Sequence, residues 1–264
     1  MLSRLLHDNA HFHGPLILMY HSIVAGADIP DSPWAVAEVT FNAQLDFLRA
    51  EGWHSTTLAG LIQTASQLSE RTVVVTFDDG YADNFKAFEA LAIRQMQASW
   101  FIVTGSIGQS QRWADPDAPR RSMLNIGQIR EMYSAGMEFG SHTVSHAKLP
   151  ELDTDIAFQE LRDSKACLEN ILGASVDGIA YPYGMFDQRI AQQAREAGYR
   201  WGCTTQSGWA LLDANPLLMR RLTIYNTDTV STLARKMAYA ANDVSWPALV
   251  RSHMVRLIPR IRKS

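Results

Sequence analysis

Short apolar runs recur along the chain, separated by longer segments in which apolar positions follow helical spacing. The clearest run covers residues 72–76, Thr-Val-Val-Val-Thr, whose length and β-branched composition are typical of a strand buried on both faces. Six other runs share this character. The pattern therefore predicts seven main strands, over residues 16–20, 72–76, 99–103, 137–141, 178–181, 199–205 and 221–225.

Helical periodicity fills most of the intervals between these strands. It predicts helices over residues 41–50, 58–65, 82–95, 126–135, 153–172, 187–197 and 229–241. Thr40 is expected to cap the first helix, and residues 53–57 to form a short extended piece before the second. Strands that alternate with helices need crossover connections and therefore run parallel. The predicted fold class is α/β, a closed or nearly closed barrel, with a doubly wound open sheet as the alternative.

Nothing along the chain divides it into several domains. A length of 264 residues suits one large α/β domain with a substantial core, and no internal repeat or linker interrupts the pattern. We expect a lead over residues 1–14, a barrel domain over 15–242 and a basic tail over 243–264.

The predicted tail differs from the rest of the chain in charge. Basic residues alternate there with apolar ones, and no acidic residue follows Asp243. This pattern is compatible with peripheral contact to an anionic membrane surface, or with a solvated extension or a segment packed on the barrel exterior. Pro259 interrupts any helix in this segment.

Composition and charge exclude several classes of protein. The 24 basic and 27 acidic residues give a net charge of −3, which argues against nucleic acid as a partner. The two cysteines, Cys167 and Cys203, fall in a predicted helix and strand and indicate free thiols. The first residues lack the pattern of a secretory signal, and the run over 16–20 is too short to span a bilayer, so we expect a cytoplasmic protein.

Two adjacent carboxylates, Asp78 and Asp79, follow the strand predicted over residues 72–76. Burial of both would be costly through desolvation and mutual repulsion unless a cation or hydrogen-bond donors offset it. Gly80 allows a sharp turn that leaves both side chains at the end of the strand. The pattern favours a metal site, and an ordinary Asp-Asp-Gly turn is the alternative.

Two further strand ends carry polar or aromatic residues. His142 and His146 follow the strand over 137–141, and on a helical turn residues four apart share a face, so both imidazoles can reach one ion. Two imidazoles and one carboxylate leave coordination positions open, as in catalytic metal sites. Tyr183 lies in the turn after the strand over 178–181, where its backbone N–H is a candidate donor to an oxyanion.

Residues 76–80, 142–146 and 181–184 together resemble the first three motifs of the polysaccharide deacetylase family, also called the NodB homology domain or carbohydrate esterase family 4. The resemblance covers roughly residues 70–225. It implies a distorted seven-stranded (β/α) barrel, the NodB homology fold. It also implies a metal-dependent hydrolase that removes N-acetyl groups from N-acetylglucosamine-type sugars in a polysaccharide, oligosaccharide or sugar conjugate.

The resemblance also assigns roles to residues. Asp79, His142 and His146 become the ligands of a divalent metal ion, most often Zn²⁺, with Co²⁺ or Ni²⁺ as alternatives. Asp78 becomes the general base that takes a proton from the attacking water. The Tyr183 N–H would help the metal to stabilise the oxyanion.

The chain departs from the family pattern at two places. Many members carry an arginine in the third motif that orients the base, where this chain has Ala180, and we expect Arg221 to replace it, with Arg220 as the alternative. A late Leu-x-x-His motif for the catalytic acid is also missing. The early Tyr20-His21 pair resembles the circularly permuted poly-N-acetylglucosamine deacetylase branch, so we expect His21 to protonate the leaving amine.

Two other functions stay open. A non-catalytic carbohydrate-binding barrel would fit the arginine missing at position 180, and an amidase or deformylase would act on a lipid-linked or small N-acyl substrate. Trp113 and Trp209 either line a sugar site by stacking or belong to the core.

Overall fold

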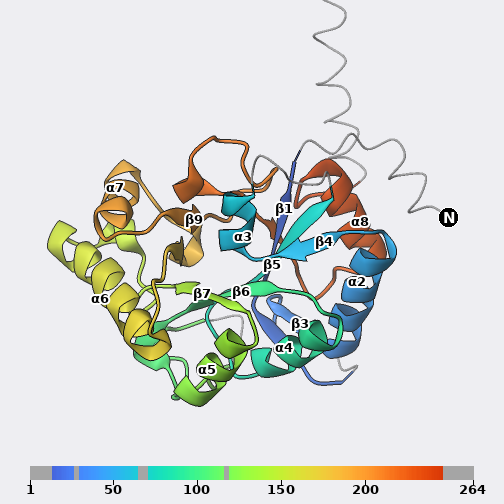
Figure 1. Ribbon diagram of the computed structural model, residues 1–264, viewed down its shortest axis with the longest axis horizontal. Coiled ribbons are helices and arrows are strands. Elements are labelled where there is room, and N and C mark those ends of the chain that lie inside the picture. Colours follow the sequence, from blue (N-terminus) through green and yellow to red (C-terminus); the bar gives the residue numbers. More distant parts are fainter. Residues whose placement is uncertain (1–13, 27–29, 65–70, 116–118, 246–264) are drawn as a thin grey trace, which may run out of the picture.

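The computed structural model describes residues 14–26, 30–64, 71–115 and 119–245, and a curled parallel sheet forms its centre (Figure 1). Along the sheet the strand order is β10-β1-β5-β6-β7-β8-β9, and β4 pairs with the first half of β5. The strand bounds are β1 (Leu16–Tyr20), β4 (His54–Thr56), β5 (Thr72–Phe77), β6 (Ala98–Ile102), β7 (Glu138–Ser141), β8 (Gly178–Ala180), β9 (Trp201–Cys203) and β10 (Leu222–Thr223).

The two edges of this sheet nearly meet. Met219 forms a parallel bridge with Cys203 of β9, and the Arg221 N–H donates to the Gln206 carbonyl at 2.9 Å. β10 follows at once and pairs with β1. The segment before β10 therefore links β9 to β1, and the nearly closed barrel expected from the sequence is confirmed.

Helices cover the outside of the barrel (Figure 1). Their bounds are α2 (Glu38–Ala50), α4 (Asn84–Ile93), α5 (Ile126–Ser134), α6 (Thr154–Leu172), α7 (Gln188–Glu196) and α8 (Val230–Tyr239). Their apolar faces pack on the outward side chains of the strands in two clusters, a large one that involves α2, α4, α5 and α8 and a smaller one under α6 and α7. Because strand side chains alternate between faces, every second residue of each strand is left to fill the interior.

A third apolar cluster fills the barrel interior. Ile17, Val74 and Phe101 point inward, and the short helix α3 (Leu58–Gln63) packs on them. The first N–H of α3 donates to Ser99 Oγ near the start of β6, so this helix closes the amino ends of the strands. The carboxyl ends are left as the open end, which is where parallel barrels hold their active sites.

Two local predictions are wrong, and one small sheet was not predicted. Thr40 does not cap α2, because the helix begins at Glu38 with Ala37 as its N-cap. The loop after β1 contains a second, two-stranded parallel sheet formed by β2 (Ser22–Val24) and β3 (Ala35–Ala37). The last two strands of the barrel, β9 and β10, are shorter than predicted.

Other predictions concern the ends of the chain and the thiols. Nearly all of the predicted lead and tail falls outside the described residues, and so does the proposed membrane contact of the tail. Within the described residues, the longest and most apolar helices fall short of what a membrane crossing requires. Cys167 and Cys203 are free thiols, as predicted.

Candidate metal centre and active site

β5 delivers the two carboxylates to the open end of the barrel. Asp79 and Gly80 both have positive φ, 71° and 85°, so the chain turns sharply after the strand. A Cβ at position 80 would lie 2.7 Å from Ile102 Cδ1, so a larger residue would require the isoleucine side chain to move and would also be strained by the positive φ. The side chains of Asp78 and Asp79 end up buried side by side, with residue exposures of 3% and 4%.

Asp79 meets the two histidines at one point. Its Oδ1 lies 3.4 Å from His142 Nε2 and 3.3 Å from His146 Nε2, and the three ligand atoms lie within 4.8 Å of one another. Asp79 Oδ1 is buried and accepts no hydrogen bond within the described part of the chain. A buried carboxylate oxygen without a donor is costly, and a cation bound between these three side chains would satisfy it.

The histidine pair does not lie on a helical turn, so this prediction is wrong. Residues 142–146 form an irregular loop in which Thr143 and His146 have positive φ, 67° and 60°. The carboxylate of Glu160 on α6 accepts two backbone N–H groups of this loop, at 2.8 and 2.9 Å. The loop conformation therefore brings the two imidazoles together, and helical spacing has no part in it.

Hydrogen bonds and burial set the protonation of the candidate ligands. His142 Nδ1 lies 2.7 Å from the Ala180 carbonyl, which places a proton on Nδ1 and leaves Nε2 free to bind a metal. Burial lowers the pKa of His146 to about 4, so its imidazole is neutral at neutral pH. Burial lowers the pKa of His142, but the neighbouring Asp79 and Asp78 carboxylates raise it by more, with a net rise. A bound cation would have to displace any proton that His142 carries on Nε2.

Arg221 lies against Asp78 inside the barrel. Its Nη1 and Nη2 donate to Asp78 Oδ1 and Oδ2 at 2.6 and 2.7 Å, and its Nε donates to the Thr204 carbonyl at 2.9 Å. The arginine is 0% exposed. Burial raises the pKa of Asp78, but the charge and hydrogen bonds of Arg221, together with the charge of His142, lower it by more, so the net shift is downward and the carboxylate is ionised. The contact expected from the sequence is present, although Arg221 lies in the segment just before β10 and Ala180 lies in β8.

His21, at the end of β1, faces the same space. Its ring packs on Trp34 with 5.1 Å between the ring centroids, and its Nδ1 is buried with no hydrogen-bond partner among the described residues. Burial lowers the pKa of His21, although the charges of Asp78 and Asp79 oppose this shift.

Tyr183 occupies a strained turn beside the histidines. Its φ of 60° lies in the left-handed region, and its ring meets His146 edge-on at 4.5 Å. Its backbone N–H donates no hydrogen bond within the described chain. A backbone donor in this state is available to a ligand oxygen.

One pocket of about 460 Å³ at the carboxyl end of the barrel is lined by His21, Asp78, Asp79, His142, His146 and Tyr183, whereas the fully buried Arg221 is not among its lining residues. Trp113 lines this pocket, whereas Trp209 packs against the large apolar cluster on the outward side of the strands. Of the two tryptophans, Trp113 alone is therefore in the place expected for a sugar-stacking residue. The pocket has further lining residues that no sequence pattern indicated, namely Trp34, Tyr81, Asp115 and Tyr225. Arg220, the alternative to Arg221, pairs with Asp213 at 2.7 Å, away from this pocket.

Comparison with known proteins agrees with this geometry. The family model described as polysaccharide deacetylase matches residues 65–202, just over half of the chain. The chain belongs to the polysaccharide deacetylase family. Members of this family are enzymes, so this polysaccharide deacetylase is an enzyme as well.

Individual relatives of this polysaccharide deacetylase cover most of its length. It is 31% identical over 212 residues to the putative polysaccharide deacetylase YxkH of Bacillus subtilis, across 79% of this chain and 70% of YxkH. It is 25% identical over 217 residues to the poly-β-1,6-N-acetyl-D-glucosamine N-deacetylase of Staphylococcus epidermidis, across 77% of this chain and 72% of that relative. The solved structure of Streptococcus pyogenes deacetylase PplD, in complex with acetate, superposes with a TM-score of 0.72 at 27% identity, across 84% of this chain and 97% of PplD.

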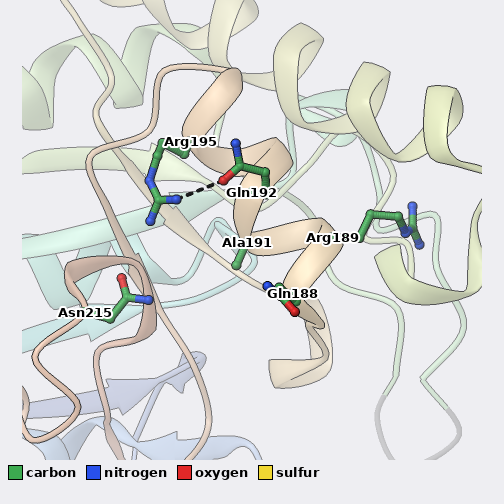
Figure 2. Close-up of a pocket in the computed structure, with 6 residues that line it drawn as sticks. All are labelled: Gln188, Arg189, Ala191, Gln192, Arg195 and Asn215. Carbon is green, nitrogen blue, oxygen red and sulfur yellow. Dashed lines mark hydrogen bonds between the residues drawn. The ribbon is translucent and has the colours of Figure 1, made fainter.

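A second hollow of this polysaccharide deacetylase lies on its outer surface, along α7 (Figure 2). Figure 2 shows Gln192 and Arg195 joined by a hydrogen bond of 2.9 Å on the helix, with Asn215 on the neighbouring segment. No carboxylate or imidazole is present among the described residues that line it. It therefore lacks the ligands that a catalytic metal site needs, although its volume of about 670 Å³ is larger.

Proposed function

We propose that this enzyme is a metal-dependent deacetylase that removes N-acetyl groups from N-acetylglucosamine-type sugars in a polysaccharide, oligosaccharide or sugar conjugate. The convergence of Asp79, His142 and His146, with the spare carboxylate of Asp78 beside them, carries the proposal. The similarity to the poly-β-1,6-N-acetyl-D-glucosamine N-deacetylase of Staphylococcus epidermidis supports the substrate class. Two imidazoles and one carboxylate with open positions favour Zn²⁺ as the ion, with Co²⁺ or Ni²⁺ as alternatives.

Each side chain then has a role that its position supports. A cation held by Asp79 and the two histidines would supply Lewis acidity to the acetamide carbonyl and the attacking water. Asp78, ionised and fixed by Arg221, accepts a proton from that water. The Tyr183 N–H donates to the carbonyl oxygen as negative charge develops there. His21 gives a proton to the amine nitrogen as the carbon–nitrogen bond breaks.

The two alternative functions differ in what supports them. A non-catalytic carbohydrate-binding barrel would fit the arginine missing at position 180, but Arg221 supplies that contact to Asp78 from the segment before β10. An amidase or deformylase that acts on lipid-linked or small N-acyl compounds would use the same side chains. A substrate panel separates it from the proposal.

The test measures the carboxylate released, acetate from N-acetyl compounds and formate from N-formyl compounds, after metal analysis of the purified protein. The panel contains N-acetylglucosamine, its oligomers, a lipid-linked N-acetyl sugar, and simple N-acyl and N-formyl amides. We expect release from the N-acetylglucosamine compounds, and we expect Asp78→Asn to abolish it while the metal content stays unchanged. The matched variant Asp213→Asn removes a surface carboxylate outside the pocket and should retain activity. Metal retention without hydrolysis of any N-acetyl sugar would contradict the proposal.

A further inference from the structure

Three aromatic rings form a column along one wall of the pocket. The ring centroids of His21 and Trp34 are 5.1 Å apart, and those of Trp34 and Tyr225 are 5.4 Å apart. All three residues line the pocket. They come from the end of β1, from the segment before β3 and from the segment after β10, so the column joins parts of the chain that are far apart in sequence.

The imidazole of His21 is held differently from that of His142. A histidine ring is usually oriented by the hydrogen bond of its second nitrogen, and His142 has such a bond to the Ala180 carbonyl. In the described part of the chain, His21 Nδ1 has no such partner although it is buried. Ring packing against Trp34 is then the contact available to fix the plane of the His21 imidazole.

Hydrogen bonds fix the backbone at Trp34. Its N–H donates to Ser32 Oγ at 3.2 Å, and its carbonyl accepts the N–H of Ser22, the residue after His21, at 3.3 Å. The Asn226 N–H donates to the Pro33 carbonyl at 2.9 Å, which ties the segment of Tyr225 to that of Trp34. The backbone of Trp34 is therefore fixed relative to the segments that carry both of its ring neighbours.

A buried ion pair supports the far end of the column. The Tyr225 N–H donates to Asp228 Oδ2 at 2.8 Å, and the same oxygen lies 2.5 Å from Lys236 Nζ. Lys236 Nζ also lies 4.7 Å from the centroid of the Tyr225 ring. Both charged residues are almost fully buried. Tyr225 is thus a rigid support on which Trp34 rests.

We infer that Trp34 is a positioning residue that holds the His21 imidazole in the orientation from which it protonates the leaving amine. This inference rests on the proposed function. The indole of Trp34 transfers no proton and acts through His21. General acids contribute about 10²- to 10⁴-fold to rates, and a misplacement of about 1 Å can cost about 10²-fold. Loss of the indole should therefore lower kcat by about 10- to 100-fold.

The experiment compares two acetyl substrates that differ in their leaving group. An N-acetylglucosamine oligomer expels an amine, which needs a proton, whereas para-nitrophenyl acetate expels a phenolate that is stable without one. We expect Trp34→Ala to lower kcat about 10- to 100-fold on the oligomer and less than about twofold on the ester. His21→Ala should give the same selectivity, and the double variant should lose little more than His21→Ala alone. Trp34→Phe, which keeps a ring, should recover most of the rate.

A spectroscopic readout on metal-free protein complements the kinetics. The imidazole proton resonances of His21 should shift in Trp34→Ala, because the ring current of the indole is lost. They should stay in place in Trp209→Phe, the matched control, since Trp209 packs against the outer core and does not line the pocket. The control should also keep both activities.

Several outcomes would overturn the inference. An equal loss on both substrates would make Trp34 a structural residue, and a change confined to KM for the oligomer would make it a sugar-binding surface. Additive losses in the double variant, or unmoved His21 resonances in Trp34→Ala, would also contradict it. A wild-type enzyme that releases acetate from neither substrate would overturn the proposed function and this inference with it, whereas an active wild type with an unaffected Trp34→Ala overturns the inference alone.

Discussion

Replacement of Arg221 by methionine would leave a buried carboxylate without its cation. The guanidinium makes two hydrogen bonds to Asp78, at 2.6 and 2.7 Å, and both residues are almost inaccessible to water. Removal of one partner of a buried ion pair costs about 3–5 kcal/mol, because the remaining charge is neither solvated nor paired. We expect the free energy of unfolding of Arg221→Met to fall by this amount at neutral pH. We also expect kcat to fall, since Asp78 loses its orientation.

The loss should depend on pH in a defined direction. In the wild type the pKa of Asp78 is lowered below its unfolded value of about 3.9, so the stabilisation is complete above that pH and is lost as the pH falls through the folded pKa. In Arg221→Met the burial remains without the guanidinium, and the pKa of Asp78 should rise above the unfolded value. In that variant the free energy of unfolding therefore falls as the pH rises from the unfolded pKa to the raised folded pKa of Asp78. The stability difference between the two proteins should therefore be largest near neutral pH and narrow below about pH 4.

Urea unfolding of metal-free protein at several pH values measures this difference. Arg221→Lys is the conservative comparison, because an ammonium keeps the charge but cannot form the two parallel hydrogen bonds. In an Asp78→Asn background the Arg221→Met change should cost clearly less, since no buried charge is stranded. A cost below about 1 kcal/mol at neutral pH, or the same cost in the Asp78→Asn background, would refute the electrostatic argument.

Two further predictions test the metal site and the turn that forms it. His146→Ala should lower metal content. It should also remove the stabilisation that Zn²⁺ gives the wild type, about 2.7 kcal/mol when the free Zn²⁺ concentration is a hundred times Kd, and with it the rise in Tm. An unchanged metal affinity by calorimetry would exclude His146 as a ligand. In urea unfolding, Gly80→Ala should lower the free energy of unfolding by about 1 kcal/mol more than Gly173→Ala does. Both positions have positive φ, but only a Cβ at position 80 would contact Ile102. Equal losses in the two variants would show that this contact carries no cost.

The sequence predicted the parts of the fold that depend on long, uniform apolar runs. β1 was predicted over its full extent and β5 to within one residue, because both are buried on both faces and rich in β-branched or large apolar residues. β2 and β3 were missed because they pair only with each other outside the main sheet, so the alternation of strands and helices that indicated the equally short β8 did not indicate them. Trp34 was missed with them, because it lies in the loop just before β3 and its contact with His21 depends on the tertiary structure.

The candidate site shows a similar division. The residue types and their positions after strands indicated a metal site made of an aspartate and the two histidines, and the family resemblance indicated Asp79 as that aspartate, but the expected helical turn was wrong. Positive φ at non-glycine residues such as Asp79, Thr143 and His146 brings the side chains together, and the sequence carries no clear signal for such conformations. Residue chemistry was thus predictable where backbone geometry was not.

The position of Arg221 follows from the closed form of the barrel. In a nearly closed barrel every strand has an inward face, so a cation that supports Asp78 can come from β8 or from the segment before β10. Ala180 on β8 belongs to the interior cluster, and its small side chain leaves space that a long one would fill. Arg221 enters that interior over the face of Phe101, 5.6 Å from its centroid, and reaches Asp78 with both nitrogens of its fork. The barrel therefore keeps the charge and the hydrogen bonds that hold the base, although the arginine that supplies them lies in the segment before β10 and not at position 180 as in the family pattern. A second arginine at position 180 would compete with Arg221 for the same buried volume and for the Asp78 carboxylate.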